Sequence, residues 1–417
     1  MTSNLDRRRF LRLAAAGAGA VALAGCGSGS DGAGAGASAG TDSDASSGPS
    51  GPSRKLKLGF IALTDAAPII MAKELGIYAE HGLDVEVIKQ ASWPATRDNL
   101  LAGEIDGAHC LSTMPYSLGA GVGGSGTDLK IAMILSNNGQ AITLNGDLSA
   151  AGYGDLDAAK DILDDRTPTM AMTFPGGTHD LWLRYWLRAT GADESKIQII
   201  AIPPAQMVEN MTVGNMDGYC VGEPWNAVAV NDGIGFTHLA TQDLWLHHPE
   251  KALVVNPKTA ADEAVMTELI AATLEACKWL DDLDNRSEAA DTIGGPNYLA
   301  TPADGIRGRL LGKYELGADL GSKDFGGEQM MFFRDGATNA PRRSYGHWTL
   351  AQYQRLGLVK EAPPASMIDE IVLTDLYAKG AEAAGVDIPD DDMAPFEVVL
   401  DGVTFDPAKP EEEAKRR

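Results

Sequence analysis

Two stretches of the chain decide the fold: NLLAGEIDGAHC at residues 99–110 and NMTVGNMDGYC at residues 210–220. They share the pattern N-x-x-x-G-x-x-D-G at an offset of 111 residues. In each copy we expect a helix to end at the first glycine, an Asp-Gly turn to follow, and an apolar strand to start after the turn. An internal repeat of this kind predicts two structural units with the same architecture.

The segments that precede each copy agree with this interpretation. Before the first copy the patterns predict a buried strand, a helix with proline in its first turn and a second strand, at residues 57–63, 68–81 and 83–88. Before the second copy the same order recurs, at residues 169–174, 178–190 and 196–202. Each copy is therefore a β-α-β-α-β unit, so we predict an α/β fold with two doubly wound parallel-sheet lobes, a central cleft and a helical C-terminal region.

The domain organisation follows from these units and from changes in composition. We expect a signal peptide, a flexible Gly/Ser/Ala tether, a first lobe, a second lobe, a return to the first lobe with a helical C-terminal region, and a charged tail. Their expected bounds are residues 1–25, 26–53, 54–137, 138–225, 226–400 and 401–417. The return crossing is expected at the segment GEPW, residues 222–225.

The N-terminus predicts export and lipid anchoring. A basic segment, RRRFLR at residues 7–12, precedes a short apolar run and resembles a twin-arginine export signal. The sequence LAGC at residues 23–26 resembles a bacterial lipoprotein cleavage box, with Cys26 where the lipid would be attached. The following residues are almost entirely small or polar and behave as a tether. We therefore expect an extracytoplasmic protein anchored to the outer face of the cell membrane.

Charge and cysteine content exclude other classes of protein. Of 417 residues, 34 are basic and 58 acidic, and the net charge of −24 makes binding to nucleic acid unfavourable. Only four cysteines occur, without a C-x-x-C pair, so neither a zinc framework nor a disulfide-rich scaffold is expected. We expect Cys110, Cys220 and Cys277 to be free and buried, although their number alone does not settle their pairing.

Ligands of parallel sheets bind beyond the carboxyl ends of the strands, so the loops after the predicted strands should face the cleft. One such loop is FPGGTHD at residues 174–180, directly before an amphipathic helix. The backbone amides around Gly177 and Thr178 would suit an anion, and His179 could direct a ring N–H into the cleft. The alternative is a simple Gly-Gly turn with a surface histidine.

Three other loops contain candidate ligand residues. Trp93 could cover a flat ligand and donate its indole N–H, or pack between the lobes. Gln140 ends the amide-rich segment at residues 137–140, which either forms a hinge turn or supplies donors to the cleft. Glu223 could accept a hydrogen bond from a ligand, orient another side chain, or cap the next element.

Enzyme signatures are missing from the sequence. It has no G-x-S-x-G elbow, P-loop or H-E-x-x-H motif, so we expect no catalytic residue and no cofactor. His247 and His248 lie near Glu250, but adjacent histidines seldom converge on one ion, and we predict no metal site.

Several long stretches resemble the nitrate/bicarbonate-binding proteins of ABC importers. They are KLKLGFIALTDAAPIIMAKELGIYAEHGLDVEVIKQASWPATRDNLLAGEIDGAH, NGQAI, FPGGTHDLWLRYWLRATG, GEPWN and LWLHHPEKA. This resemblance implies a type II periplasmic-binding-protein fold that traps a small planar oxyanion and delivers it to a permease with its ATPase. It also implies that Trp93, Gln140, His179 and Glu223 line the pocket.

The histidine after Gly-Gly-Thr resembles the nitrate branch of that family. One position departs from the pattern that the resemblance implies: Leu246 stands where nitrate-binding members are expected to have a lysine after tryptophan. The expected ligand is nitrate or nitrite, with bicarbonate or another small solute as the alternative. A ligand-sensing receptor, or an enzyme of thiamine-pyrimidine synthesis on the same fold, are further alternatives.

Overall fold

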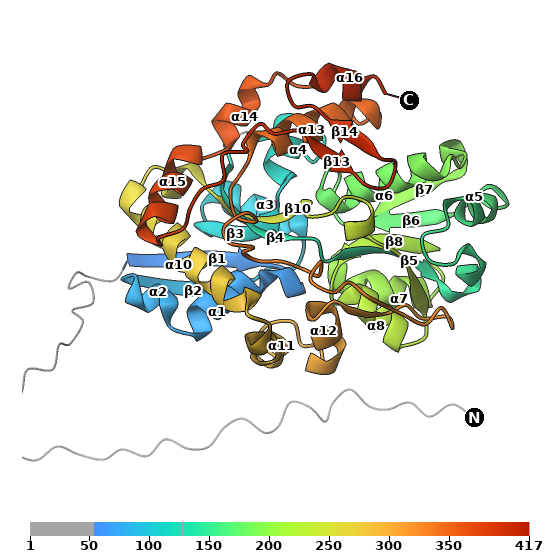
Figure 1. Ribbon diagram of the computed structural model, residues 1–417, viewed down its shortest axis with the longest axis horizontal. Coiled ribbons are helices and arrows are strands. Elements are labelled where there is room, and N and C mark those ends of the chain that lie inside the picture. The colour runs from blue at the N-terminus through green and yellow to red at the C-terminus, as the bar shows by residue number, and fades with distance from the viewer. Residues whose placement is uncertain (1–53, 127, 417) are drawn as a thin grey trace, which may run out of the picture. The chain divides into compact units, whose positions relative to one another are not determined.

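The computed structural model describes residues 54–126 and 128–416 (Figure 1). The predicted signal peptide, the tether and Cys26 lie outside the described residues. In the described part, two five-stranded sheets lie next to each other, and helices pack on both faces of each sheet (Figure 1).

The first sheet has the strand order β2-β1-β3-β10-β4. Strand β1 pairs in parallel with β2 and β3, whereas β10 is antiparallel to both β3 and β4. The strands are β1 (Arg54–Phe60), β2 (Leu83–Lys89), β3 (Gly107–Leu111), β4 (Lys130–Asn137) and β10 (Pro249–Val255).

The second sheet has the order β7-β6-β8-β5-β9 and repeats this arrangement. Strand β6 is parallel to β7 and β8, and β5 is antiparallel to β8 and β9. The strands are β5 (Gln140–Asn145), β6 (Thr169–Met172), β7 (Gln198–Ala201), β8 (Gly218–Gly222) and β9 (Gly235–Ala240).

The two-lobe α/β fold is thus confirmed, with one difference in the sheets. Each sheet contains one antiparallel strand that the parallel-sheet prediction did not include. These two strands, β5 and β10, are the ones with which the chain enters a lobe from the other lobe. A chain that enters a lobe from the other lobe starts its strand at the cleft and runs away from it. The parallel strands of the same sheet run toward the cleft, so the entering strand is antiparallel to them.

The repeated aspartate explains why the motif recurs. Asp106 accepts a hydrogen bond from the backbone N–H of Lys57 at 2.8 Å, and Asp217 accepts one from the backbone N–H of Thr169 at 2.8 Å. Each aspartate thereby joins the start of the third strand of its unit to the first strand, at the middle of β1 in one copy and at the start of β6 in the other. The glycine before it, Gly103 in the first copy, has a φ of 70°, as expected after a helix.

Most predicted helices are present, with one break. The expected helix at 68–81 is two helices, because Gly76 has a φ of 80° and interrupts the first one. The helices of the two repeat units are α1 (Ala67–Glu74), α2 (Ile77–Glu80), α3 (Trp93–Ala102), α4 (Met114–Gly119), α5 (Leu156–Asp164), α6 (Thr178–Thr190), α7 (Met207–Thr212) and α8 (Trp225–Asn231). Helix α6 has the expected bounds.

The expected end of the second lobe at residue 225 is wrong. Helix α8 and strand β9 still belong to this lobe, because β9 pairs with β5 along Gly235–Ala240. The chain returns to the first sheet only after a short 3₁₀ helix, Thr241–Asp243, when it enters β10. The segment at 222–225 therefore continues the second lobe and is not the return crossing.

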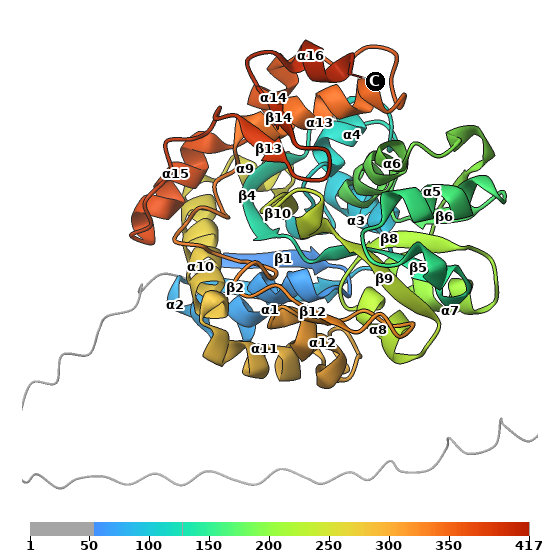
Figure 2. The same ribbon diagram turned by 45° about the vertical axis from the view of Figure 1, so that its right-hand side comes forward.

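The C-terminal region is mainly helical, as predicted, and contacts both lobes. In Figures 1 and 2, α13, α14 and α16 lie on one side of the sheets, and α11 and α12 lie on the other. Its elements are α9 (Pro257–Ala260), α10 (Glu263–Asp281), α11 (Arg286–Ile293), α12 (Ala303–Leu310), β11 (Lys313–Glu315), β12 (Ser322–Asp324), α13 (Arg343–Arg355), α14 (Ser366–Ile371), α15 (Thr374–Ala383), β13 (Phe396–Val398), β14 (Val403–Phe405) and α16 (Pro410–Ala414).

The residues expected to form a charged tail, 401–417, are folded up to residue 416, the last one described. Strand β14 pairs with β13, and Phe405 and Ala414 are buried in the same apolar cluster as Trp348 of α13. The charges of this segment are also paired, since Arg416 contacts Asp401. The prediction of a charged tail at 401–417 is wrong, because the buried side chains of Phe405 and Ala414 hold this segment against the rest of the protein.

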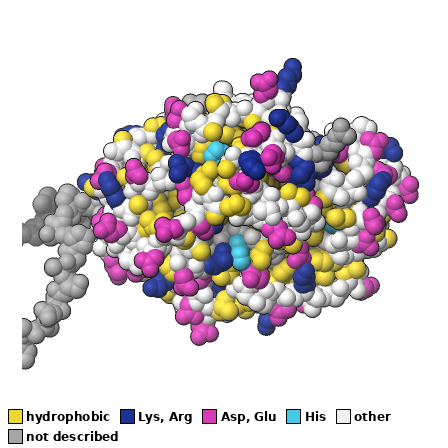
Figure 3. Space-filling model, turned by 45° about the horizontal axis from the view of Figure 1, so that its top comes forward, with side chains coloured by type: hydrophobic (Ala, Val, Ile, Leu, Met, Phe, Trp, Pro, Cys, Tyr) yellow, Lys and Arg dark blue, Asp and Glu magenta, His cyan; other side chains and the backbone are white. Residues whose placement is uncertain are grey.

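Three further expectations can be compared with the described residues. Cys110, Cys220 and Cys277 are free and buried, as predicted. Within residues 54–126 and 128–416, none of the helices has the length and apolar content required to span a bilayer. On the face shown in Figure 3, acidic and basic side chains are interspersed, without a continuous basic stripe.

A carboxylate at the end of α10 holds the long segment that leads to α13. Asp281 accepts hydrogen bonds from the backbone N–H groups of Phe332, Phe333 and Arg334 at 2.7–2.9 Å. It also pairs with the buried guanidinium of Arg286 at 2.8 Å. One side chain thus satisfies three backbone donors and one buried cation.

We expect Asp281→Ala to lower the free energy of unfolding by about 3–5 kcal/mol, because it leaves the buried Arg286 without its carboxylate partner. Urea denaturation measures this difference. The exposed Asp284, three residues further on, provides the control, and Asp284→Ala should change stability by less than about 0.5 kcal/mol. Equal stability of the two variants would contradict the role given to Asp281.

Candidate functional site

A cluster of polar side chains lies where the two lobes meet, and every member is fully buried. It is built from the segment after β1, from β3 and β10 of the first sheet, and from β5 and the start of α6 in the second lobe. Its residues are Asp65, His109, Gln140, Thr178, His179, Glu250 and Lys251. Since buried charges are unfavourable unless they are paired, the contacts within this cluster determine what it can bind.

Lys251 on β10 is the central cation of the cluster. Its Nζ atom donates to Asp65 Oδ2 at 2.8 Å and to Glu250 Oε1 at 2.7 Å. The cluster therefore contains a lysine, although Leu246 stands at the position where the resemblance implies one. The lysine is supplied five residues further along the chain, where β10 carries it into the cluster. An ammonium group has three N–H donors, so the two ion pairs leave one for another acceptor.

The two carboxylates are held by both lobes. Asp65 accepts from Gln140 Nε2 at 3.0 Å, and Glu250 accepts from the hydroxyl of Thr178 at 2.6 Å and from the indole of Trp182 at 2.9 Å. Burial raises the pKa of Asp65 and of Glu250, but Lys251 and the neighbouring histidines lower both by more. Both groups are therefore ionised. Burial lowers the pKa of Lys251, but Asp65 and Glu250 raise it by more, so it lies above its ordinary value.

His179 lies in the second lobe with both ring nitrogens in contact with polar atoms. Its Nε2 is 2.7 Å from Gln140 Oε1, and its Nδ1 is 2.5 Å from the hydroxyl oxygen of Thr173. Burial, together with the charge of Lys251, lowers the pKa of His179. The ring is thus neutral near pH 7, donating from Nε2 to the amide oxygen and accepting at Nδ1 from the hydroxyl.

Trp93 is the first residue of α3 and is fully buried. Its ring centroid lies 5.8 Å from that of His109 and 5.8 Å from Lys251 Nζ. The indole Nε1 has no hydrogen-bond partner among the described residues. A buried N–H without a protein acceptor is unusual, so this donor is free to serve a ligand.

The Gly-Gly turn before α6 allows the lobes to approach closely. Gly177 is the N-cap of α6, and a Cβ atom there would lie 2.7 Å from Leu111 Cδ1 of the first lobe. The hydroxyl of Thr178 donates to Glu250 of the first lobe. Asp180 accepts from the N–H of Gly176 at 2.8 Å. The first-turn amides of α6 remain the part of this turn suited to an anion.

Glu223 follows β8, next to the cluster, and is fully buried. Its Oε2 accepts from the N–H of Ala227 at 3.1 Å, and its Oε1 lies 3.6 Å from Arg309 Nη1. Of the three roles considered for this residue, the observed contacts correspond to capping the next helix. Among the described residues, its side chain makes no hydrogen bond to Lys251, His179 or Gln140.

His247 and His248 have separate partners. His247 Nε2 contacts Glu328, and His248 Nε2 lies 2.8 Å from the hydroxyl of Thr241. Across the described ranges, no group of three His, Cys, Asp or Glu side chains is arranged to hold a metal ion.

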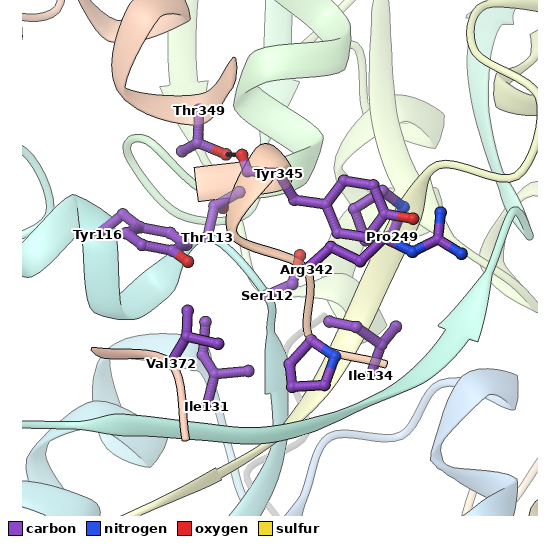
Figure 4. Close-up of a pocket in the computed structure, with 11 residues that line it drawn as sticks. Ser112, Thr113, Tyr116, Ile131, Ile134, Pro249, Arg342, Tyr345, Thr349 and Val372 are labelled. Atoms are coloured by element: carbon purple, nitrogen blue, oxygen red, sulfur yellow. Dashed lines mark hydrogen bonds between the residues drawn. The ribbon is translucent and has the colours of Figure 1, made fainter. Parts of the chain in front are cut away.

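A small cavity is lined in part by Pro249, the residue before Glu250, and is too small for an oxyanion. It has a volume of about 20 Å³, and Figure 4 shows Ser112, Thr113, Tyr116 and Tyr345 around it. A cavity needs roughly 10–15 Å³ to hold one water molecule, so this one has room for a single water. The hydroxyls of Ser112 and Thr113, which have no hydrogen-bond partner among residues 54–126 and 128–416, would suit that water.

Sequence reasoning missed four members of the cluster: Asp65, His109, Glu250 and Lys251. A signal was present for Asp65, because it follows the first predicted strand, whose loop was expected to face the cleft. Glu250 and Lys251 belong to the segment LWLHHPEKA, which carries the family resemblance, so their position in this segment was a signal for both. His109 lies inside a strand, where a histidine resembles an ordinary core residue.

Comparison with known proteins identifies the relatives of this chain. A profile of the NMT1-like family matches residues 50–294. The nitrate/nitrite binding protein NrtA of Nostoc sp. is 41% identical over 392 residues, which cover 88% of this chain and 86% of that protein. The bicarbonate-binding protein CmpA of Synechococcus elongatus is 32% identical over 386 residues, which cover 86% of this chain and 85% of that protein.

Among solved structures, that of the periplasmic nitrate-binding protein NrtA from Synechocystis PCC 6803 matches with a TM-score of 0.81 at 36% identity. The match covers 86% of this chain and 97% of that one. Sequence and fold therefore lead to the same assignment. With two lobes that enclose a buried polar cluster, the chain belongs to the NMT1-like family of periplasmic-binding-fold proteins.

Proposed function

We propose that this protein is the solute-binding component of an ABC importer and that it binds nitrate, or nitrite, between its lobes. The observation that carries the proposal is the convergence of Lys251, Gln140 and His179 in one buried cluster, with Trp93 beside it. An ammonium group and several N–H donors in such a setting favour a small anion.

The proposed ligand residues are Trp93, Gln140, Gly177, Thr178, His179 and Lys251. Glu223 lies next to these residues, where its carboxylate caps α8, and we do not propose its side chain as a ligand. A planar anion suits this set, because Trp93 offers a flat face and an indole N–H, while Lys251 offers charge and the first-turn amides of α6, from Thr178 onward, offer directed donors. No cofactor or metal is part of the proposal.

The relatives favour nitrate over bicarbonate. The NrtA protein of Nostoc sp. is the more similar of the two named above, and the solved structure with the high TM-score is also a nitrate-binding protein. Binding proteins among the relatives also weigh against the enzyme alternative. A ligand-sensing receptor would bind its anion with the same cluster, so the cluster does not distinguish sensing from transport. Delivery of the anion to a permease and its ATPase is therefore part of the proposal.

The proposal for location is an extracytoplasmic protein that a lipid on Cys26 anchors to the outer face of the cell membrane. It rests on the basic segment, the apolar run and the LAGC sequence at residues 23–26. A tethered receptor would remain close to the permease that it serves.

Calorimetric titration of the mature protein with nitrate tests the function. We expect Lys251→Met to weaken nitrate binding by roughly 10- to 150-fold, because a charge-assisted hydrogen bond contributes about 1.5–3 kcal/mol. The exposed Lys258 provides a matched control, and Lys258→Met should bind nitrate as the wild type does. Heat with bicarbonate but none with nitrate would contradict the proposed ligand.

Trp93→Phe complements this test, since it removes the indole N–H and leaves the ion pairs of Lys251 intact. We expect it to weaken nitrate binding by about tenfold, the effect of one hydrogen bond to a charged group, without a large loss of stability. Unchanged affinity in a folded Trp93→Phe variant would remove this residue from the site.

Another prediction concerns the membrane anchor. Expressed in a bacterial host that lipidates exported proteins, the wild type should fractionate with membranes, because each buried CH₂ of the lipid contributes about 0.8 kcal/mol. Cys26→Ala should appear in the soluble extracytoplasmic fraction. Ser28→Ala, in the same segment, serves as the control and should remain with the membrane. Equal solubility of wild type and Cys26→Ala would contradict lipid anchoring.

A further inference from the structure

His109 is a buried histidine of the cluster with one ring nitrogen left unpaired. It lies on β3, next to β10 in the sheet, and its Nε2 is 2.7 Å from Asp65 Oδ1. Its side chain is fully buried, and its Nδ1 has no hydrogen-bond partner among the described residues. A ring that donates from Nε2 to a carboxylate has only a lone pair at Nδ1 when it is neutral.

The charges of the cluster do not balance when an anion is added. Asp65 and Glu250 contribute two negative charges, and Lys251 contributes one positive charge. The other carboxylates close by have their own cations, since Asp180 pairs with Arg184 at 2.7 Å and Glu223 lies near Arg309. The buried group therefore carries a net charge of −1, and a monoanion would make it −2 among fully buried side chains.

The two histidines of the cluster differ in their ability to accept a proton. At His179 the Thr173 hydroxyl and Gln140 Oε1 already complement a neutral ring, so a proton on Nδ1 would displace the bond that the hydroxyl donates. At His109 a proton can be added to Nδ1 while the bond from Nε2 to Asp65 is kept. We propose that the anion binds together with one proton, which is taken from solvent by the Nδ1 atom of His109.

This inference rests on the proposed function for the identity of the anion. The proton adds to a neutral imidazole and gives an imidazolium, so the cluster returns to a net charge of −1 with the anion present. Lys251 and His109 then supply two cations on either side of Asp65, and the anion gains a second positive group in the same cluster.

The groups that act on the ring are Asp65 before α1, Glu250 and Lys251 on β10, and the uncharged Trp93 on α3. Burial lowers the pKa of His109, and Lys251 lowers it further, against the opposing effects of Asp65 and Glu250. Without the anion the ring is therefore neutral near pH 7. A bound anion raises the pKa of the ring, so affinity should fall as the pH rises through the pKa of the liganded state.

The test is calorimetric titration of the mature protein with sodium nitrate at about pH 7, in phosphate and in Tris, two buffers with different ionisation enthalpies. We expect the heats to differ between buffers in the amount that corresponds to uptake of about one proton per nitrate. In His109→Gln the heat should become independent of the buffer. Its affinity should also lose its pH dependence between about pH 6 and about pH 8. His347→Gln, on α13 away from the cluster, is the control and should retain the uptake.

Each outcome of this titration has a definite meaning. Nitrate binding with equal heats in both buffers would overturn the inference and leave the proposed function intact. Proton uptake that survives in His109→Gln and disappears in His179→Gln would also overturn it. Absence of nitrate binding in the wild type would overturn the proposed function itself.

A second measurement avoids dependence on the folding of the variant. Wild-type protein labelled with ¹⁵N-histidine reports the protonation of each ring nitrogen through its chemical shift. We expect one histidine to change from a neutral to a fully protonated pattern on addition of nitrate. Neutral patterns for all histidines at saturating nitrate would overturn the inference.

Discussion

The ion pairs of Lys251 with Asp65 and Glu250 determine how the two lobes meet. All three groups belong to the first lobe, yet each carboxylate is bonded to donors of the second: Gln140 to Asp65, and Thr178 with Trp182 to Glu250. Moving three charges out of water is unfavourable unless their remaining hydrogen-bonding capacity is satisfied. The burial of this triad and the close contact between the lobes therefore depend on each other.

The same triad limits which solutes the proposed site can hold. An anion gains from the third N–H of Lys251 but is repelled by two carboxylates that cannot move away without leaving Lys251 unpaired. A dianion would raise the unbalanced charge by two units, whereas a monoanion raises it by one, and unbalanced charge is most unfavourable where water is absent. A cluster with this composition should therefore prefer small monoanions to sulfate or phosphate, whatever the shape of the cavity.

Much of the fold could be predicted because the information is local. The N-x-x-x-G-x-x-D-G repeat specifies a helix end, a turn and a strand, and its aspartates act on the first strand of their own lobe. What could not be predicted depends on contacts between distant residues. Lys251 meets Asp65 across 186 positions of the chain, and no pattern near either residue indicates the other. The antiparallel strands β5 and β10 were missed for the same reason, since their direction depends on where the chain has come from.

The sequence predicted the part of the candidate site that lies at the ends of helices and strands. Trp93, Gln140 and His179 follow or begin elements whose ends were expected to face the cleft. Gln140 and His179 belong to the cluster, and Trp93 lies beside it. Glu223 also follows a strand, but its carboxylate binds the next helix, because position at a strand end does not determine where a side chain points. His109 was missed because it lies within β3, where only its neighbours show that it is not a simple core residue.

The C-terminal region adds a constraint that the two-lobe description lacks. The hydroxyl of Tyr353 on α13 lies 3.1 Å from the carbonyl oxygen of Thr113 in the first lobe and 2.6 Å from that of Gly176 in the second. A hydroxyl has one proton, so it can donate fully to only one of the two carbonyls at a time. The connection is therefore worth about 1 kcal/mol, the net value of one hydrogen bond, and can be broken without unfolding either lobe.

Because Gly176 belongs to the turn that starts α6, any separation of the lobes at this hydroxyl also moves the first-turn amides and His179 away from Lys251. The region that braces the lobes is thus connected directly to the turn that carries the proposed anion donors.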